Sequence, residues 1–435
     1  MSNGIRFDQG LPDISHSQEL LRRAKGLIPS QTQTLAKGPS QYVGGVAPVY
    51  LQRGAGSHVW DVDGNEYIDL TMAVGPLSLG YSYPRVDKAI RRQLEQGITF
   101  SLMHPLEVEV AELVRSVVPG TEMVRYSKTG ADVTSAAVRL ARAFTRRDRV
   151  LCSGYHGWHD WYVGTTARHD GVPSSTRALT TPFPHNDPWQ LIELLDETVA
   201  CVILEPVLFE EPTREFLPAL RRACNESGAL LIFDEMWTGF RVALGGAQER
   251  YDVKADLACF SKAIANGMPL SVLTGRAAVM SALEDEVFFY TTFGGEALSL
   301  AAAQATILEL QEHEVPAALR LQGARLQAGY NRLARERGMT FTRALGLECR
   351  TMIQFDANAG DPLLQKSLLQ QELLRHGVLW SGFHNLSFSH GDAEVDHVLG
   401  AYERALEVLQ DAVRAGDLAS RILGTPVKPV FRKTL

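Results

Sequence analysis

The sequence predicts an α/β fold built on a mainly parallel sheet. Short apolar runs of strand length recur along the middle of the chain, and segments of helical character separate them. A chain of 435 residues, 45% hydrophobic and 21% charged, has enough material for two or three globular units. The apolar runs are residues 123–127, 149–154, 200–206, 229–235 and 256–261.

The two ends of the chain differ from this middle part. Near the start, Asp-Gly lies between alternating apolar residues in GSHVWDVDGNEYIDL, which indicates a hairpin. Near the end, residues 321–338 and 394–413 have the charged, amphipathic pattern of helices with one buried face. We therefore expect an N-terminal segment with a small β-meander (1–75), a large domain (76–320) and a small C-terminal α+β domain (321–435).

Composition and charge argue against several classes of protein. No apolar run approaches the roughly 18 residues that a membrane helix needs. The first ten residues have neither the basic nor the apolar region of an export signal, so we expect a cytoplasmic protein. A net charge of −7 without a basic stripe offers little attraction to nucleic acid.

The five cysteines are odd in number, lie far apart in the sequence and form no CxxC pair. This pattern predicts neither a disulfide framework nor a zinc site. We expect buried free thiols.

Ionisable residues follow two of the predicted strands. Asp234 and Glu235 end the run 229–235, and Lys262 comes directly after the run 256–261. Each has an ordinary explanation, since an acid at a strand end can cap a loop and a lysine there can extend its amine to water. The other explanation is pyridoxal 5'-phosphate (PLP). Lys262 would form the Schiff base, and Asp234 would keep the pyridine nitrogen protonated.

A phosphate site is the next requirement, and the strand 123–127 leads into one. Thr129, Gly130 and Ala131 form a turn before a helical segment, where backbone N–H groups and the helix dipole favour an anion. An ordinary helix start is the alternative.

Two further strand ends complete the candidate cofactor site. Tyr155 could stack on the cofactor ring, and Glu205 is a supporting acid. His156 and His159 have no nearby carboxylate cluster beyond Asp160, so we predict no metal site.

The sequence resembles the class III aminotransferases that use PLP, and within them the branch of glutamate-1-semialdehyde 2,1-aminomutase. The resemblance extends from about residue 20 to about residue 410. Four stretches carry it: WDVDGNEYIDL, GPLSLGYSYP, FDEMWTGFRVALGGAQ and TTFGGEALSLAAA.

This resemblance implies a PLP-dependent transferase of fold type I, with a large PLP-binding domain around a seven-stranded, mainly parallel sheet and a small α+β domain. It also implies a homodimer whose active sites are shared between subunits. Lys262 matches the Schiff-base lysine, Asp234 the pyridinium partner and Tyr155 the stacking aromatic residue. Thr292 matches a threonine that the neighbouring subunit contributes to the phosphate.

The sequence also departs from the family pattern. The phosphate turn loses a hydroxyl at Ala131. On the substrate side, Lys37 stands where the aminomutase has an arginine, and Val74 stands where it has a tryptophan. A shorter stretch with His384 and Asn385 replaces the loop that carries an aminomutase glutamate.

Because these departures fall on the substrate side, our first hypothesis is an aminotransferase with a different substrate. It would move an amino group from a donor amino acid, glutamate, to an aldehyde or ketone, with sugar-derived carbonyl compounds as candidate acceptors. The aminomutase itself is the alternative. A non-catalytic protein that keeps the fold is a third hypothesis, against which the intact Lys262 and Asp234 argue.

Overall fold

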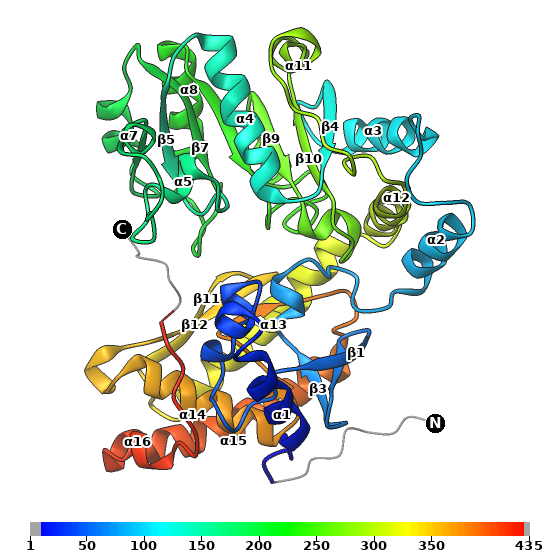
Figure 1. The fold of residues 1–435 in the computed structure, drawn as a ribbon. Helices are drawn as coiled ribbons and strands as arrows, with labels where there is room; N and C mark the ends of the chain where they lie inside the picture. The colour runs from blue at the N-terminus through cyan, green and yellow to red at the C-terminus, as the bar shows by residue number, and fades with distance from the viewer. Residues whose placement is uncertain (1–9, 430–435) are drawn as a thin grey trace. The chain divides into compact units, whose positions relative to one another are not determined.

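The computed structural model describes residues 10–429, which form two compact units (Figure 1). Of the described residues, the terminal unit comprises 10–83 with 317–429, and the central unit comprises Pro84–Pro316. The start of the chain, where we found no export signal, includes residues 1–9, which lie outside the described part. The expected division at residues 75 and 320 stays a prediction.

The central unit is built on a seven-stranded sheet with the order β4-β10-β9-β8-β7-β5-β6. All neighbouring pairs are parallel except the two that involve β10, which is antiparallel to both β4 and β9. The predicted mainly parallel sheet is therefore confirmed. The strands are β4 (Met123–Ser127), β5 (Arg149–Ser153), β6 (Thr180–Pro182), β7 (Val199–Leu204), β8 (Leu230–Asp234), β9 (Leu257–Phe260) and β10 (Ser271–Gly275).

Each of the five predicted apolar runs overlaps one of these strands. Every residue of β7, β8 and β9 is buried, as expected for strands covered on both faces. Strands β6 and β10 were not predicted from the sequence. The first has only three residues, and the second follows β9 with only the short 3₁₀ helix η5 (Lys262–Ala265), and no α-helix, between them.

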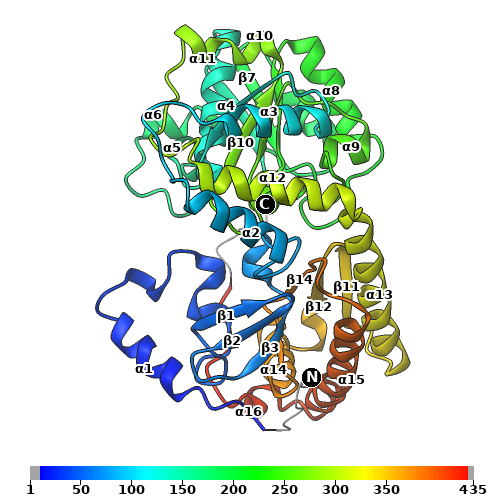
Figure 2. The same cartoon turned by 90° about the vertical axis from the view of Figure 1, so that its right-hand side faces the viewer.

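Some helices of the central unit pack on this sheet, and others pack on one another. α4 begins in a capping box, in which Thr129 and Asp132 satisfy each other's backbone N–H groups, and packs across strands β7 to β10. α12 packs against α2 and α3 (Figure 2) and is largely buried around its circumference. The helices are α2 (Pro84–Leu94), α3 (Pro105–Val117), α4 (Gly130–Thr145), α5 (Asp160–Val163), α6 (Ser174–Arg177), α7 (Pro188–Leu194), α8 (Phe216–Ser227), α9 (Ala247–Tyr251), η5 (Lys262–Ala265), α10 (Ala277–Met280), α11 (Ala282–Asp285) and α12 (Ala297–Glu312).

The terminal unit holds two smaller sheets, with the orders β1-β2-β3-β13 and β11-β12-β14. The predicted hairpin is present as the antiparallel pair β2 and β3, and Gly64 adopts φ +91° in its turn. β13 joins this sheet parallel to β3, so the N-terminal meander is completed by a strand from the C-terminal part. The strands are β1 (Leu51–Ala55), β2 (His58–Asp61), β3 (Glu66–Asp69), β11 (Thr342–Leu347), β12 (Arg350–Phe355), β13 (Val378–Leu379) and β14 (Phe383–Asn385).

Both amphipathic segments predicted near the C-terminus are helices, α13 and α15. The helices of the terminal unit are α1 (Ser15–Ala24), α13 (Val315–Glu336, which begins in the central unit), α14 (Pro362–Arg375), α15 (Asp392–Ala415) and α16 (Leu418–Arg421). Its short 3₁₀ helices are η1 (Pro29–Gln31), η2 (Leu35–Lys37), η3 (Pro39–Gln41), η4 (Met72–Val74) and η6 (Ala357–Ala359).

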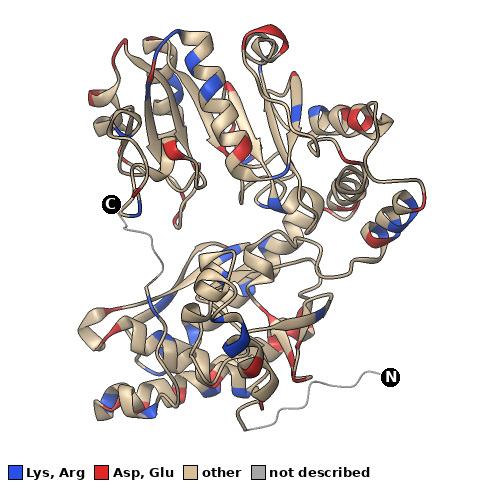
Figure 3. Ribbon diagram, viewed as in Figure 1, with Lys and Arg blue, Asp and Glu red and all other residues tan. Residues whose placement is uncertain are grey.

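The five cysteines are buried free thiols, as expected from the sequence. Burial raises the pKa of Cys152 to about 12. Among residues 10–429, no helix combines the length and hydropathy needed to cross a bilayer. Basic and acidic residues are interspersed over the elements seen in Figure 3.

Candidate active site

Five parallel strands of the central unit, β4, β5, β7, β8 and β9, end at the same edge of the sheet. Ligands of open α/β sheets bind at this carboxyl edge. A predicted site residue lies at or just beyond the end of each strand: Thr129 after β4, Tyr155 after β5, Glu205 after β7, Asp234 in β8 and Lys262 after β9.

Asp234 is 1% exposed, and His156 orients its carboxylate. The Nδ1 atom of His156 lies 2.8 Å from Oδ2 of Asp234, and the N–H of Met236 donates to Oδ1 at 3.1 Å. Burial raises the pKa of Asp234, against the opposing effect of His156. The Nε2 atom of His156 is buried and has no hydrogen-bond partner within residues 10–429. From the sequence, His156 was considered only as a metal ligand, and this contact was not predicted.

Glu235, the neighbouring acid, has a structural role. It is fully buried and accepts hydrogen bonds from the N–H groups of Ala247 at 2.8 Å and Gln248 at 3.0 Å, and from the hydroxyl of Thr238. These contacts stabilise the start of α9. Burial raises the pKa of Glu235 to about 7. Of the two adjacent acids, Asp234 is therefore the one available to a ligand at the strand ends.

Lys262 begins η5, directly beyond β9. Asp234 pairs with Cys259 in the sheet, so Lys262 lies three residues beyond the partner of Asp234 and two beyond the end of β9. Its φ of +49° is uncommon for a residue with a side chain and is a feature found at functional sites. The hydroxyl of Ser261 donates to the carbonyl of Leu270 at 2.7 Å and closes the base of this segment.

The turn before α4 has the features of a phosphate site. The Oδ2 atom of Asp132 accepts from the N–H of Thr129 at 2.8 Å, whereas the N–H groups of Gly130 and Ala131 lie in the first turn, where a helix supplies no acceptor. A Cβ at Gly130 would lie 2.7 Å from Sδ of Met236, so the turn packs tightly beside the end of β8. Gly157 packs as closely on Ala131, where a Cβ would lie 2.6 Å from that of the alanine.

Tyr155 and Glu205 are joined through the backbone. The N–H of Tyr155 donates to Oε1 of Glu205 at 2.7 Å, and the Glu205 side chain packs against Gly154, which has φ +106°. The Tyr155 side chain is 50% exposed, so its ring is accessible to a ligand. Glu205 thus supports the segment that presents the aromatic ring.

Thr292 does not follow one of these strands but lies on the exposed segment before α12. This segment rests on β4, since a Cβ at Gly294 would lie 2.9 Å from the carbonyl oxygen of Tyr126. Thr292 itself is exposed in the single chain.

The predicted substrate residues lie in the terminal unit, and three of them gather around η4. Val74 belongs to η4, Lys37 belongs to η2, which packs against η4, and the Nδ2 atom of Asn385 donates to the carbonyl of Thr71 at 3.1 Å. Val74 has φ +71°, a strained conformation for a β-branched residue. Lys37 is exposed, and Asn385 is buried.

His384 differs from these residues because its ring is already saturated with hydrogen bonds. It is fully buried, and its two ring nitrogens lie 2.7 Å from the hydroxyl of Thr351 and 2.6 Å from that of Tyr402. Burial lowers the pKa of His384 to about 3, so the ring is neutral. It has no nitrogen left for a substrate, whereas the substrate-binding role of Asn385 stays a prediction.

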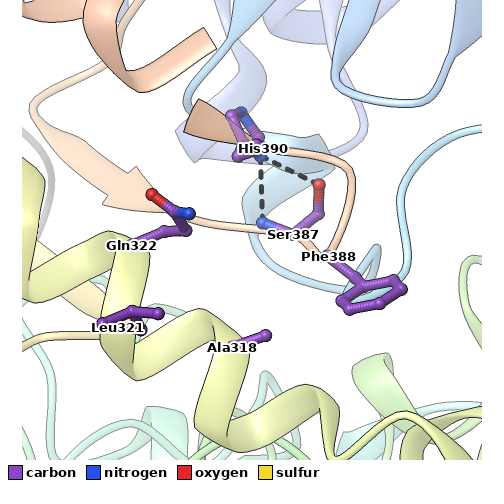
Figure 4. A pocket seen from close by; sticks show the side chains of 7 residues that line it. Ala318, Leu321, Gln322, Ser387, Phe388 and His390 are labelled. Atoms are coloured by element: carbon purple, nitrogen blue, oxygen red, sulfur yellow. Dashed lines mark hydrogen bonds between the residues drawn. The ribbon is translucent and has the colours of Figure 1, made fainter. Parts of the chain in front are cut away.

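A cavity of about 140 Å³ in the terminal unit contains none of the predicted site residues (Figure 4). The N–H and hydroxyl of Ser387 lie 3.0 and 2.9 Å from Nδ1 of His390 beside it. This pair closes the turn before α15.

These features of the central unit together fit PLP. The buried carboxylate of Asp234 can pair with a protonated ring nitrogen, and the exposed face of Tyr155 can stack on the ring. The start of α4 at Gly130, where Gly157 packs on Ala131, can bind the phosphate. Lys262 supplies the amine at the same edge of the sheet.

Comparisons with known proteins identify the same chemistry. The family model of class III aminotransferases matches residues 41–390. The chain is 32% identical to a 3-aminobutyryl-CoA aminotransferase of Cloacimonas acidaminovorans over 90% of this chain and 97% of the relative. It is 36% identical to a glutamate-1-semialdehyde 2,1-aminomutase of Thermus thermophilus, covering 90% and 99%. The solved structure of the PLP form of FumI from Sphingopyxis sp. MTA144 aligns with a TM-score of 0.85 at 28% identity, covering 92% and 97%.

Proposed function

The chain belongs to the class III aminotransferases, which are PLP-dependent enzymes, and we propose that within this family it transfers an amino group to a hydroxyl-rich aldehyde or ketone. We assign glutamate as the donor and a sugar-derived carbonyl compound as the acceptor. The observation that carries the amino-transfer chemistry is the set of residues at the carboxyl edge of the central sheet.

Three residues would carry the chemistry at this edge. Bound PLP supplies an aldehyde that links covalently to an amine and a ring that withdraws electrons from the carbon bearing the amino group. Lys262 would hold the aldehyde at rest, and its amine, once released, would move the proton at the α-carbon. Asp234 would keep the ring nitrogen protonated, and His156 would hold the Asp234 carboxylate in place.

The remaining cofactor residues would bind and orient. Tyr155 would cover one face of the ring, with its backbone held by Glu205. The N–H groups of Gly130 and Ala131, with the hydroxyl of Thr129, would bind the phosphate. Two N–H donors at a helix start can compensate for the hydroxyl that Ala131 lacks.

We also propose a homodimer in which Thr292 completes the phosphate site of the neighbouring subunit. Large apolar side chains are exposed on two segments of the central unit, including Leu102 at 78% and Met103 at 79% on one, and Phe288 at 74% and Phe293 at 58% on the other. Thr292 lies beside Phe293. Exposed apolar surface of this kind favours a protein interface. Light scattering should give twice the mass of the chain.

On the substrate side, the residues around η4 disfavour a small carboxylate substrate held by an arginine. Lys37 offers a point charge in place of a bidentate pair. Val74 is smaller than a tryptophan and leaves room, and Asn385 can hydrogen-bond a hydroxyl group. These features support a larger polar acceptor.

We expect neither a membrane nor a nucleic acid as a partner, and we expect a cytoplasmic location. The net charge of −7, with acidic and basic residues interspersed, is the basis for expecting no nucleic-acid partner. The basis for expecting no membrane partner is that no apolar run approaches the roughly 18 residues that a membrane helix needs.

The second candidate is glutamate-1-semialdehyde 2,1-aminomutase, which the 36% identity to the Thermus thermophilus relative favours. A comparison of kcat/KM for the semialdehyde with values for a panel of aldehyde and keto sugars, with glutamate as donor, separates the two. We expect the sugars to be the better substrates. Efficient isomerisation of the semialdehyde to 5-aminolevulinate, without net transfer to any acceptor, would reverse the order of the candidates.

A further inference from the structure

Lys128 stands directly before the turn that would bind the phosphate, and its ammonium group is held in a partly buried site. The Nζ atom donates to Oε1 of Glu296 at 2.7 Å and to the carbonyl of Pro269 at 3.1 Å. The two side chains are only 20% and 10% exposed, so solvent screens this ion pair less than a surface pair.

Glu296 fixes a second segment through the same carboxylate. It caps α12, because its oxygens accept from the N–H groups of Leu298 at 2.8 Å and Ser299 at 3.0 Å. It lies at the end of the exposed segment that carries Thr292. The ion pair therefore connects the phosphate turn to the Thr292 segment.

Pro269 provides the third connection. It ends the segment that begins at Lys262, and its carbonyl accepts from both Lys128 and the hydroxyl of Ser299, each at 3.1 Å. Ser261 and Leu270 close the base of the same segment. One ammonium group thus joins the three segments that hold Thr129, Lys262 and Thr292.

The pKa shifts of Lys128 and Glu296 show how burial and their mutual contact oppose each other. Burial lowers the pKa of Lys128, although Glu296 opposes this shift. Burial alone would raise the pKa of Glu296, but the hydrogen bonds from Lys128 and Ser299 bring it below its ordinary value. Its 2.7 Å contact with Nζ favours the charged form of both the carboxylate and the ammonium group.

We propose that Lys128 is a positioning residue for PLP: with Glu296 and Pro269 it holds the phosphate turn, the Lys262 segment and the Thr292 segment in the arrangement that binds the cofactor. This inference rests on the proposed assignment of the cofactor site. Lys128 acts through Glu296, so removing either partner should have the same effect. A lysine that only attracted the phosphate directly would not depend on Glu296.

The test is the dissociation constant for PLP, measured by adding PLP to the apoprotein of Lys128→Met, Glu296→Gln and Lys128→Arg. We expect the constant to rise about tenfold in each of the first two, the effect of a lost hydrogen bond to a charged group. Arginine keeps the charge and donors, so Lys128→Arg should remain close to the wild type.

Arg221→Met is the matched control. Arg221 pairs with Asp256 at 2.8 Å, with the side chains 20% and 6% exposed, and Asp256 precedes β9 at the opposite edge of the same sheet. Its loss should lower the melting temperature of the apoprotein but leave PLP affinity unchanged. If Arg221→Met weakened PLP binding as much as Lys128→Met, the effect would be one of global stability and the inference would be wrong.

Two other outcomes would also overturn it. Unchanged PLP affinity in Lys128→Met would show that the contacts do not position the cofactor. Weak binding in Lys128→Met with normal binding in Glu296→Gln would show that Lys128 acts on the phosphate alone. Failure of the proposed cofactor site is distinguished by borohydride trapping in the wild type, which would then label a lysine other than Lys262.

Discussion

The central and terminal units present their candidate residues on different kinds of backbone. In the central unit, residues such as Asp234 and Lys262 lie at the ends of regular parallel strands. In the terminal unit, the candidates gather around η4, where Met72, Ala73 and Val74 in succession have positive φ angles. The cofactor edge follows from sheet topology, whereas the substrate region depends on one strained turn. We therefore expect changes at the central edge to alter chemistry and changes in the terminal unit to alter stability or specificity.

The largest effect is expected from Asp234→Asn. A neutral amide cannot hold the proton on the ring nitrogen, so kcat should fall on the order of 10² to 10³-fold, the range for losing one electrostatic group in an active site. The absorbance of bound PLP and the rate of transfer from glutamate measure retention and chemistry separately. Glu235→Gln is the matched control, because Glu235 stabilises α9, and it should keep most of its activity. The reverse result would show that Glu235 is the partner of PLP.

In the terminal unit, we expect His384 to affect the free energy of unfolding and not the rate of amino transfer. Its folded pKa of about 3 lies below the unfolded value of 6.5, so the unfolded chain binds a proton that the folded chain does not. With respect to this histidine, the fold therefore has its full stability above pH 6.5 and loses stability as the pH falls. Between pH 6.5 and 4 the loss should reach roughly 3 kcal/mol. Urea unfolding at a series of pH values should give a shallower dependence for His384→Gln, and equal slopes would contradict the assignment.

Lys366 should show a dependence of the same sign at higher pH. It lies on α14 with Nζ beside Gly382, and burial lowers its pKa to about 8 from 10.5. The unfolded chain binds the additional proton between these values, so stability rises as the pH increases from 8 to 10.5. Lys366→Met should raise the free energy of unfolding by about 2 to 3 kcal/mol at pH 7. A destabilised variant at pH 7 would show that the ammonium makes a favourable contact.

The smallest effect is expected from Thr292→Ala, which should weaken PLP binding by about 1 to 2 kcal/mol, the range for a hydrogen bond to a charged group. Mixing Thr292→Ala chains with Lys262→Ala chains tests where this hydroxyl acts. If the neighbouring subunit supplies it, one site in each mixed dimer has both residues intact and should bind PLP with normal affinity. Uniformly weakened sites in the mixed dimers would place Thr292 in its own subunit's site.

The same comparison explains what could be predicted from the sequence. Continuous apolar runs ending in Asp234 and before Lys262 indicated buried parallel strands, and parallel strands bring their ends to one edge. The contact between His156 and Asp234 was missed, because the loop after β5 must be placed beside the end of β8 before the distance of 2.8 Å is apparent.

In the terminal unit, prediction was weaker for a physical reason. Residue type alone suggested that His384 could bind a substrate, but Thr351 and Tyr402, which saturate its ring, are distant in the sequence. The positive φ of Val74 also has no sequence signal, since valine rarely adopts it. Long-range hydrogen bonds and backbone strain are therefore the features that the sequence pattern does not reveal.

The central claim is that PLP is held by Lys262 at the carboxyl edge of the central sheet, and chemical trapping tests it most directly. Reducing the holoenzyme with sodium borohydride makes the link between cofactor and lysine permanent, and mass spectrometry of the digested protein locates the pyridoxyl group. We predict a single labelled peptide, with the label on Lys262, and none in Lys262→Ala. A label on another lysine, such as Lys128 or Lys366, would contradict the account.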